Sequence, residues 1–373
     1  MDLCGNNTTC LCATIQQLMP DPVDNIFLQL IFGLLYTLVW LLAVAGNLGV
    51  IYVAILCKHV SFTVRTVFIV SLAASDLLIS LTSLPVTAVT IFVREWIFPT
   101  VLCKVSGTIQ GSSIFISSFT LTAIAIDRYY MIVHPMTGPN VTYQRAMTAV
   151  ILIWLFGYLL ACPMFIFSVV NNYPGVCGQF CEERWPGQGV QGTAPGRKIY
   201  GLAVLIVQFG FPAILCSFCY WSISKTLAVQ LQKRFENQIL LPASEQRLIH
   251  RRRKTNRMMI AMVTSFVMAW LLLNIVNIIR DFDLYRFVIP VKYFSLAFGA
   301  SHVIAMTVAI WNPIIYCWFN EQFRQALKRF FPELISSTDR LSRSKQFDGD
   351  SQQKKIPLAG RMRNRKLSVP VDV

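Results

Sequence analysis

Long runs of apolar residues, separated by short polar segments, dominate the chain. Seven of these runs can form helices that cross a hydrocarbon core about 30 Å thick, which takes about 20 residues. They cover residues 27–57, 64–92, 101–133, 147–170, 199–229, 257–280 and 288–318. At 320–331, aromatic and aliphatic residues recur at helical spacing between basic ones, as in an interfacial helix. The pattern predicts an all-α membrane protein, a seven-transmembrane helix bundle with an amphipathic eighth helix.

Composition supports this class. The chain has 373 residues, of which 55% are hydrophobic and only 14% are charged, with a mean hydropathy of +0.54. Soluble domains carry about 25% charged residues. An odd number of spans puts the two termini on opposite sides of the membrane.

The basic residues predict the orientation, because they accumulate in cytoplasmic loops. No Lys or Arg precedes Lys58, whereas Arg251, Arg252 and Arg253 lie in a basic run between the fifth and sixth spans. The N-terminus is therefore expected outside and the C-terminus in the cytoplasm of a multi-pass plasma-membrane protein. Because the net charge of +15 is divided among membrane-flanking loops, it favours membrane lipids and cytoplasmic partners over nucleic acid.

Four segments follow from this topology. Residues 1–26 form the extracellular N-terminal segment, 27–319 the bundle, 320–331 the amphipathic helix and 332–373 a disordered cytoplasmic tail. Overlapping sequons at Asn6 and Asn7 predict glycosylation. Serine and threonine residues in the tail are candidate phosphorylation sites for a regulatory partner.

Cysteines divide according to the same topology. Those within the spans are expected to be small buried hydrophobic residues. Those on the oxidising side are expected to form disulfides, with the pairing left open. They are Cys4, Cys10, Cys12, Cys103, Cys177 and Cys181.

Polar residues within the spans are costly and usually face the interior of a bundle. Asn47, Asp76 and Asn312 lie at similar depths if the spans alternate in direction. They predict one polar cluster, either a structural hydrogen-bond network or a pocket for water and sodium. Prolines within the spans predict helix kinks; they are Pro85, Pro163, Pro212 and Pro313.

Asp127 and Arg128 are adjacent opposite charges near the end of the third span. Cys103 lies 25 residues before Arg128, or about 37 Å along a helix. The ion pair is therefore expected at the cytoplasmic interface, where Arg128 either turns inward to other helices or extends to the lipid headgroups.

Together these motifs resemble those of rhodopsin-like G-protein-coupled receptors, over about residues 27–331. The matching residues, in the order typical of that family, are Asn47, Asp76, Asp127-Arg128-Tyr129, Trp154, Pro212, Tyr220, Phe266, Trp270 and Asn312 to Tyr316. Within the family the chain is most similar to neuropeptide Y and neuropeptide F receptors. The stretches that carry this resemblance are IQGSS, CEERWPG, HRRRKTNRMM and SHVIAMTVAIWNPIIY.

The resemblance implies a receptor for a peptide with an amidated Arg-Phe or Arg-Tyr end. Thr87, Gln110, Asn277 and His302 match positions around the ligand, and Asp281 matches the residue that pairs with its arginine. Neutral polar side chains suit an amide, and a desolvated guanidinium needs a carboxylate. The alternatives are interhelical hydrogen bonds for Thr87 and Gln110, a neutral structural role for His302, and internal pairing of Asp281 with Arg280 or Arg286.

The resemblance also implies an activation switch. Asp127 holds Arg128 at rest, and Arg128 with Tyr220 and Tyr316 stabilises an open pocket for a heterotrimeric G protein. Arrestin and receptor kinases are further partners, acting through the tail. The complete set is Asp127, Arg128, Tyr129, Tyr220, Phe266, Trp270, Asn312, Pro313 and Tyr316.

A Cys103–Cys181 disulfide is implied in the same way, with Cys177 as the rival partner of Cys103. Ser117 joins Asn47 and Asp76 in the expected sodium pocket. No other cofactor and no catalytic residue is expected.

Three positions depart from the family pattern. Leu272 stands where a proline is usual, Ser118 where an aliphatic residue is usual, and Val308 where a polar residue often completes the sodium pocket. Two other protein classes make different predictions. A transporter predicts repeated halves and discontinuous helices, and an intramembrane enzyme needs a second carboxylate or a similar catalytic set at the depth of Asp76.

Overall fold

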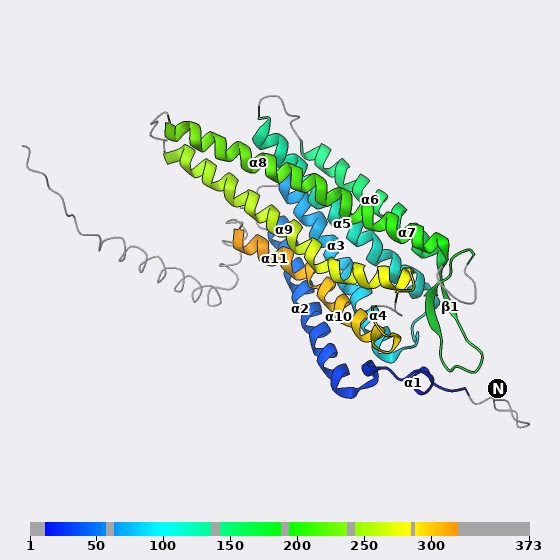
Figure 1. Ribbon diagram of the computed structural model, residues 1–373. Coiled ribbons are helices and arrows are strands. Elements are labelled where there is room, and N and C mark those ends of the chain that lie inside the picture. Colours follow the sequence, from blue (N-terminus) through cyan, green and yellow to red (C-terminus); the bar gives the residue numbers. More distant parts are fainter. Residues whose placement is uncertain are drawn as a thin grey trace, which may run out of the picture. The chain divides into compact units, whose positions relative to one another are not determined.

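The computed structural model describes residues 12–56, 63–135, 142–187, 194–236, 243–284 and 288–319. Within these ranges, seven helical spans are long and apolar enough to cross a membrane, which confirms the predicted seven-helix bundle (Figure 1). The expected amphipathic helix, the tail and the sequons at Asn6 and Asn7 lie outside the described residues.

The first four spans are α2 (Ile26–Leu56), α3 (Val64–Leu81) with α4 (Ser83–Val93), α5 (Thr100–Val133) and α6 (Tyr143–Phe167). The fifth is α7 (Pro195–Leu205), a π-helical turn (Ile206–Gly210) and α8 (Phe211–Glu236). The last two are α9 (Ala243–Asp281), and α10 (Phe294–Met306) with α11 (Val308–Phe319). Helix α9 begins well before the predicted residue 257, because its first turns are polar and hydropathy does not detect them.

Three spans are interrupted shortly before a proline. The breaks are at Thr82 before Pro85, at the π-helical turn before Pro212, and at Thr307 before Pro313. A proline has no N–H to donate and crowds the carbonyl four residues earlier, so the helix opens there. By contrast, α6 continues through Pro163.

Side chains from other helices bond two of the carbonyls that lack the usual N–H donor four residues later, because that residue is a proline. Ser118 Oγ donates to the Gln208 carbonyl at 2.6 Å, four residues before Pro212. Asn47 Nδ2 donates to the Ala309 carbonyl at 2.8 Å, four residues before Pro313. Because unpaired backbone groups are costly in hydrocarbon, these bonds explain a polar residue in α5 and another in α2.

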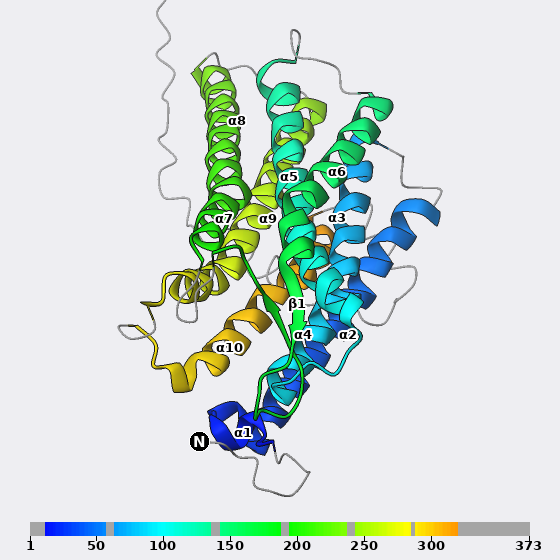
Figure 2. The same cartoon turned by 90° about the vertical axis from the view of Figure 1, so that its right-hand side faces the viewer.

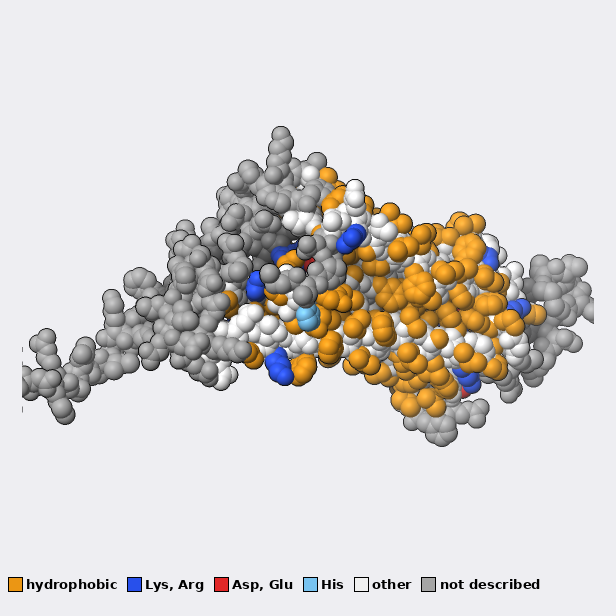
Figure 3. Space-filling view, turned by 90° about the horizontal axis from the view of Figure 1, so that it is seen from above, with side chains coloured by type: hydrophobic (Ala, Val, Ile, Leu, Met, Phe, Trp, Pro, Cys, Tyr) orange, Lys and Arg blue, Asp and Glu red, His pale blue; other side chains and the backbone are white. Residues whose placement is uncertain are grey.

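Helix α5 lies at the centre of the bundle and packs against α3, α6 and α8. The outer faces of the bundle are apolar: Leu34, Leu155 and Ile214 are among the exposed side chains. Figure 3 shows hydrophobic side chains covering much of one face, with Lys and Arg side chains scattered toward its two ends. An exposed apolar surface of this extent is that of a membrane protein.

One end of the bundle carries an antiparallel hairpin of β1 (Ser168–Asn171) and β2 (Phe180–Glu183), in which Val170 is paired with Cys181. We call this the hairpin end. A short helix, α1 (Ile15–Leu18), lies at the same end, as Figures 1 and 2 show. A disulfide joins Cys103, at the start of α5, to Cys181 in β2, so the hairpin is fixed to the bundle core.

Candidate functional site

A cavity of about 880 Å³ lies at the hairpin end, bounded by α1, α4, α5, β2, α7, α9 and α10. A smaller cavity of about 130 Å³ extends between α5, α7 and α9 to Trp270. Gln110 and Asp281 line both cavities. Thr87 lines the larger cavity and Asn277 the smaller one. Four of the five predicted ligand residues therefore line these two neighbouring cavities.

The fifth, His302, does not line either cavity. It is fully buried, and its Nδ1 lies 2.9 Å from the Tyr36 hydroxyl. Its ring stacks at 6.1 Å on Phe298, which does line the larger cavity. The position of His302 fits the structural alternative, because it packs α10 against α2 behind the cavity wall.

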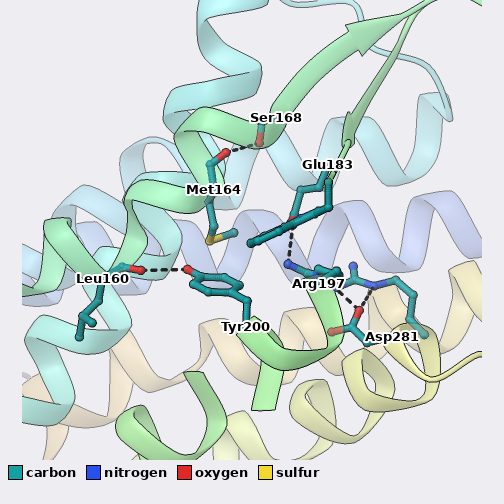
Figure 4. Close-up of polar contacts among 9 residues, drawn as sticks. Leu160, Met164, Ser168, Glu183, Arg197, Tyr200 and Asp281 are labelled. Atoms are coloured by element: carbon teal, nitrogen blue, oxygen red, sulfur yellow. Dashed lines mark hydrogen bonds and ion pairs between the residues drawn. The ribbon is translucent and has the colours of Figure 1, made fainter. Parts of the chain in front are cut away.

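Asp281 lies at the end of α9 with its side chain buried. Its Oδ1 is 3.4 Å from Arg197 Nε and 3.0 Å from Arg280 Nε. Arg197, near the start of α7, also donates through Nη1 to Glu183 of β2. Figure 4 shows the Arg197 side chain between the two carboxylates. The internal pair of Asp281 with Arg280 is one of the alternatives expected from the sequence. The pair with Arg197 was not expected. The other alternative partner, Arg286, lies outside the described residues.

Aromatic packing fixes the hairpin side of this cluster. Trp185 donates from Nε1 to Glu183 at 3.0 Å, and its ring lies 4.3 Å from Phe167 and 5.1 Å from Tyr200. The Tyr200 hydroxyl donates to the Leu160 carbonyl at 3.0 Å, also drawn in Figure 4. The cluster therefore ties α6, β2, α7 and α9 together at the cavity wall.

The larger cavity carries an excess of negative charge. Its lining has five acidic and three basic side chains, an excess of two negative charges. The acidic ones are Glu95, Glu182, Glu183, Asp281 and Asp283, and the basic ones are Arg94, Arg197 and Arg280. On the hairpin, Tyr173 donates to Glu182 at 2.6 Å, and this hydrogen bond raises the pKa of the Tyr173 phenol. A low-dielectric cleft with this charge concentrates cationic ligands.

The polar residues at mid-depth form three sets of contacts and not the single predicted cluster. Asn312 Nδ2 donates to Asp76 Oδ2 at 2.9 Å, whereas Asn47 bonds backbone carbonyls. Ser117 lies 3.4 Å, oxygen to oxygen, from Ser75. The structure thus brings Asp76 and Asn312 into contact and gives Asn47 a separate structural bond.

At the opposite end of α5, Arg128 Nη2 lies 2.7 Å from Asp127 Oδ2, and both side chains are only 8% exposed. Arg128 Nη1 also lies 3.3 Å from Met131 Sδ. The guanidinium is therefore buried and paired, not extended outward. Tyr220 and Tyr316 are buried as well, while the Tyr129 hydroxyl lies 3.3 Å from His134 Nε2.

Below the smaller cavity, aromatic residues connect α9 to the π-helical turn. Trp270 is buried and lines this cavity. Phe266, one turn away, stacks on Phe209 with ring centroids 5.5 Å apart. Phe266 therefore packs α9 against the turn that Ser118 holds by its bond to Gln208.

Comparison with known proteins identifies the family. Residues 46–316 match the family described as "7 transmembrane receptor (rhodopsin family)". The chain belongs to this rhodopsin family of seven-transmembrane receptors. The family membership predicted from the motifs is thereby confirmed. Membership in this receptor family excludes the transporter and the intramembrane enzyme as alternatives.

Among members of the rhodopsin family, the chain is similar to neuropeptide receptors. It is 48% identical to Neuropeptide receptor 3 of Caenorhabditis elegans over 319 residues, covering 85% of this chain and 83% of that one. It is 32% identical to Neuropeptide Y receptor type 2 of Bos taurus, covering 84% and 79%. Squid rhodopsin has the same fold, with a TM-score of 0.69 at 24% identity over 85% of this chain and 92% of that one.

Two features of this rhodopsin-family receptor were not predicted from the sequence. One is Arg197 as the partner of Glu183 and Asp281; its only signal was its place in a basic pair just before the fifth span. The other is the Cys12–Cys177 disulfide, for which the sequence supplied six candidate cysteines and no pairing. The rival Cys177 is therefore bonded elsewhere, and Cys103 pairs with Cys181.

Proposed function

We propose that this receptor binds an amidated neuropeptide ending in Arg-Phe or Arg-Tyr and transmits binding to a heterotrimeric G protein. The observation that carries the proposal is the negatively charged cavity, in which a buried carboxylate, Asp281, is held by guanidinium groups. A carboxylate that binds arginine side chains within the protein has the geometry to bind one from a ligand. Similarity to neuropeptide receptors gives independent support.

In this proposal the peptide enters from the hairpin end, which faces the outside of the plasma membrane. Its amidated end lies near Gln110 and Asn277, toward Trp270, while Thr87 contributes from α4. An amide group offers N–H donors and a carbonyl acceptor, and neutral Gln, Asn and Thr side chains satisfy both. The preceding arginine then reaches Asp281, which lines both cavities.

Activation proceeds from Trp270 to the opposite end of the bundle. Ligand contacts displace Trp270 and Phe266, α9 moves, and the Arg128 guanidinium leaves Asp127 for Tyr220 and Tyr316. A pocket for the G protein opens on the cytoplasmic side, and ligand and G protein strengthen each other's binding by the same factor. Arrestin and receptor kinases act on the same side, through the tail.

A sodium ion near Asp76 is part of the proposal. The Asp76 carboxylate and the Ser117 hydroxyl offer the oxygen ligands that a hard cation prefers. Sodium is expected to lower agonist affinity in the parent receptor and to have no effect in Asp76→Asn. An equal sodium dependence in both proteins would remove sodium from the mechanism.

A ligand screen tests the proposal. Cells that express the receptor are exposed to peptides ending in Arg-Phe-amide or Arg-Tyr-amide, with cAMP and calcium as readouts. Matched controls are the same peptides with a free carboxyl end, or with citrulline in place of arginine. The proposal is supported if the receptor responds to the parent peptides and responds more weakly both to the peptides with a free carboxyl end and to those with citrulline. Responses only to peptides without these features would favour a receptor for another peptide class.

A further inference from the structure

Residues Cys12–Asp24 lie across the hairpin end and are fixed to it at several points. We call this segment the N-terminal strap. The Cys12–Cys177 disulfide joins it to the loop between β1 and β2. Backbone hydrogen bonds reinforce this junction, from the Ala13 N–H to the Gly175 carbonyl at 3.0 Å and from the Cys177 N–H to the Ala13 carbonyl at 2.9 Å.

The other side of the strap is fixed to the end of α4. Gln16 Nε2 donates to the Val93 carbonyl at 2.9 Å. Arg94 Nη1 donates to the Met19 carbonyl at 2.8 Å and pairs with Asp24 at 2.9 Å. The strap therefore spans from the hairpin loop to α4, as the position of α1 in Figure 2 shows.

Ile15, in the α1 turn of the strap, lines the larger cavity together with Ile91 of α4 and Phe180 of β2. The strap is thus one of the cavity walls. Leu18, one turn later in the same short helix, is 48% exposed and is not among the cavity-lining residues. Ile15 therefore lines the cavity, whereas Leu18, at the end of α1, is exposed beyond the cavity lining.

Because the strap is fixed at both sides, ligand binding does not have to order it, and the entropic cost of binding is lower. A loose N-terminal segment would have to be ordered when a ligand made contact with it, which weakens binding. The disulfide and the hydrogen bonds order this segment beforehand, so that an apolar contact with Ile15 keeps most of its favourable free energy. With the amidated end of the peptide near Gln110, as in the proposed function, the preceding part of the peptide occupies the larger cavity, which Ile15 of the strap lines.

We infer that the N-terminal strap is a ligand-binding element: Ile15 contacts an apolar side chain of the bound peptide upstream of its amidated end, and the Cys12–Cys177 disulfide holds Ile15 in place. The occupant named here rests on the proposed function. The contact is separate from the Asp281 cluster, because it involves the upstream part of the peptide and not its arginine.

Binding of two amidated Arg-Phe peptides of different length tests this inference. The short peptide has four residues, and the long one has four further apolar and neutral residues upstream. Ile15→Ala keeps the disulfide and is expected to weaken binding of the long peptide about four- to fifteenfold, the effect of one or two buried methylene groups. The short peptide should bind as before. Leu18→Ala is the matched control and should leave both affinities unchanged.

The paired variant Cys12→Ser/Cys177→Ser, compared at equal surface expression, should weaken binding of the long peptide in the same direction. An Ile15→Ala receptor that binds the long peptide like the parent, or that loses both peptides equally, would overturn the contact. If Ile15→Ala weakens binding of the long peptide but Cys12→Ser/Cys177→Ser leaves it unchanged, the proposed role of the disulfide would be wrong.

A parent receptor that binds neither peptide would contradict the proposed function, and the strap is then tested without a ligand. A cysteine introduced by Thr90→Cys, on the cavity lining, is labelled with a membrane-impermeant maleimide. Labelling is expected to be faster in the Cys12→Ser/Cys177→Ser background, because a loosened wall opens the cavity. Equal labelling rates in the two backgrounds would show that the strap does not bound the cavity.

Discussion

Arg197 and Asp281 are in contact through Nε and Oδ1, 3.4 Å apart, at the wall of both cavities. The same guanidinium holds Glu183, so one side chain links the hairpin to the end of α9. The carboxylate proposed to bind the ligand's arginine therefore already has an arginine partner from the receptor itself. Binding of a peptide arginine must exchange one guanidinium for another or add to the cluster.

Asp281→Asn is expected to reduce the potency of an Arg-containing agonist by at least about thirtyfold, because loss of one partner of a desolvated charge pair costs about 2–5 kcal/mol. The citrulline analogue should lose much less. Concentration–response curves at matched surface expression measure both. Asp283→Asn is the control, since Asp283 pairs with Lys198 at 3.6 Å instead of with Arg197. Equal losses for the two ligands would show that Asp281 is not coupled to the ligand's arginine.

Arg197→Gln is expected to increase the potency of the Arg-containing agonist about two- to fivefold, the effect of a weak ion pair worth about 0.4–1 kcal/mol, because the Arg197–Asp281 contact is long at 3.4 Å. The reason is competition, because the substitution removes an internal guanidinium from Asp281. The citrulline analogue should be unaffected. Arg184→Gln serves as the control, because Arg184 is 60% exposed and pairs with Glu182. A loss of potency for both ligands would instead identify Arg197 as a support for the hairpin.

Asp127→Asn is expected to raise basal signalling, because Asp127 holds the buried Arg128 guanidinium at 2.7 Å. The measurement is ligand-independent cAMP or calcium signalling at matched surface expression. Asp24→Asn, which breaks an ion pair at the hairpin end, is the control and should leave the baseline unchanged. Normal expression with unchanged basal and stimulated signalling would contradict a switch role for the pair.

Ser118→Ala is expected to destabilise the receptor by about 1–3 kcal/mol, because it leaves the Gln208 carbonyl without its partner. Thermal inactivation of the purified receptor should therefore occur at a lower temperature. The double variant Ser118→Ala/Pro212→Ala should recover part of the loss, since residue 212 then supplies a backbone N–H. Ser265→Ala, which removes a bond within one helix, is the control. No recovery in the double variant would contradict the link to Pro212.

Leu272→Pro is expected to change basal activity or agonist potency without preventing surface delivery. Helix α9 is continuous from Ala243 to Asp281, and Leu272 is 42% exposed on its outer face. A proline there removes one backbone donor and bends the helix just beyond Trp270. Leu272→Ala keeps the helix intact and should behave as the parent does. Curves for Leu272→Pro that superimpose on the parent, baselines included, would mean that the missing proline has no mechanical consequence.

The sequence alone determined the helices and their order. In hydrocarbon, every backbone N–H and C=O must be bonded within the protein, so a sufficiently long apolar run has to be helical. The rule identified all seven spans. It did not place the start of α9 at Ala243, because outside hydrocarbon a helix no longer needs an apolar sequence.

The sequence also identifies the polar residues that are candidates for function. Asp76 and Arg128 stand out because a charge near or within a span needs a partner, whereas Asp281 was identified through the family resemblance. Their partners were harder to predict. Asn312 was expected near Asp76 because the two lie at a similar depth, and Asp127 is the sequence neighbour of Arg128. Arg197, which lies 84 residues from its partner Asp281, was not predicted.

Only the tertiary structure decided these distant pairings. Cys12 and Cys177 are 165 residues apart, and Ser118 and Gln208 are 90 apart. Hydropathy places a residue at a depth in the membrane, but contact also requires a particular rotation of each helix and a particular path for each loop. Rotations and loop paths are set by packing among all the helices at once. The depths of the functional residues could therefore be read from the chain, and their partners could not.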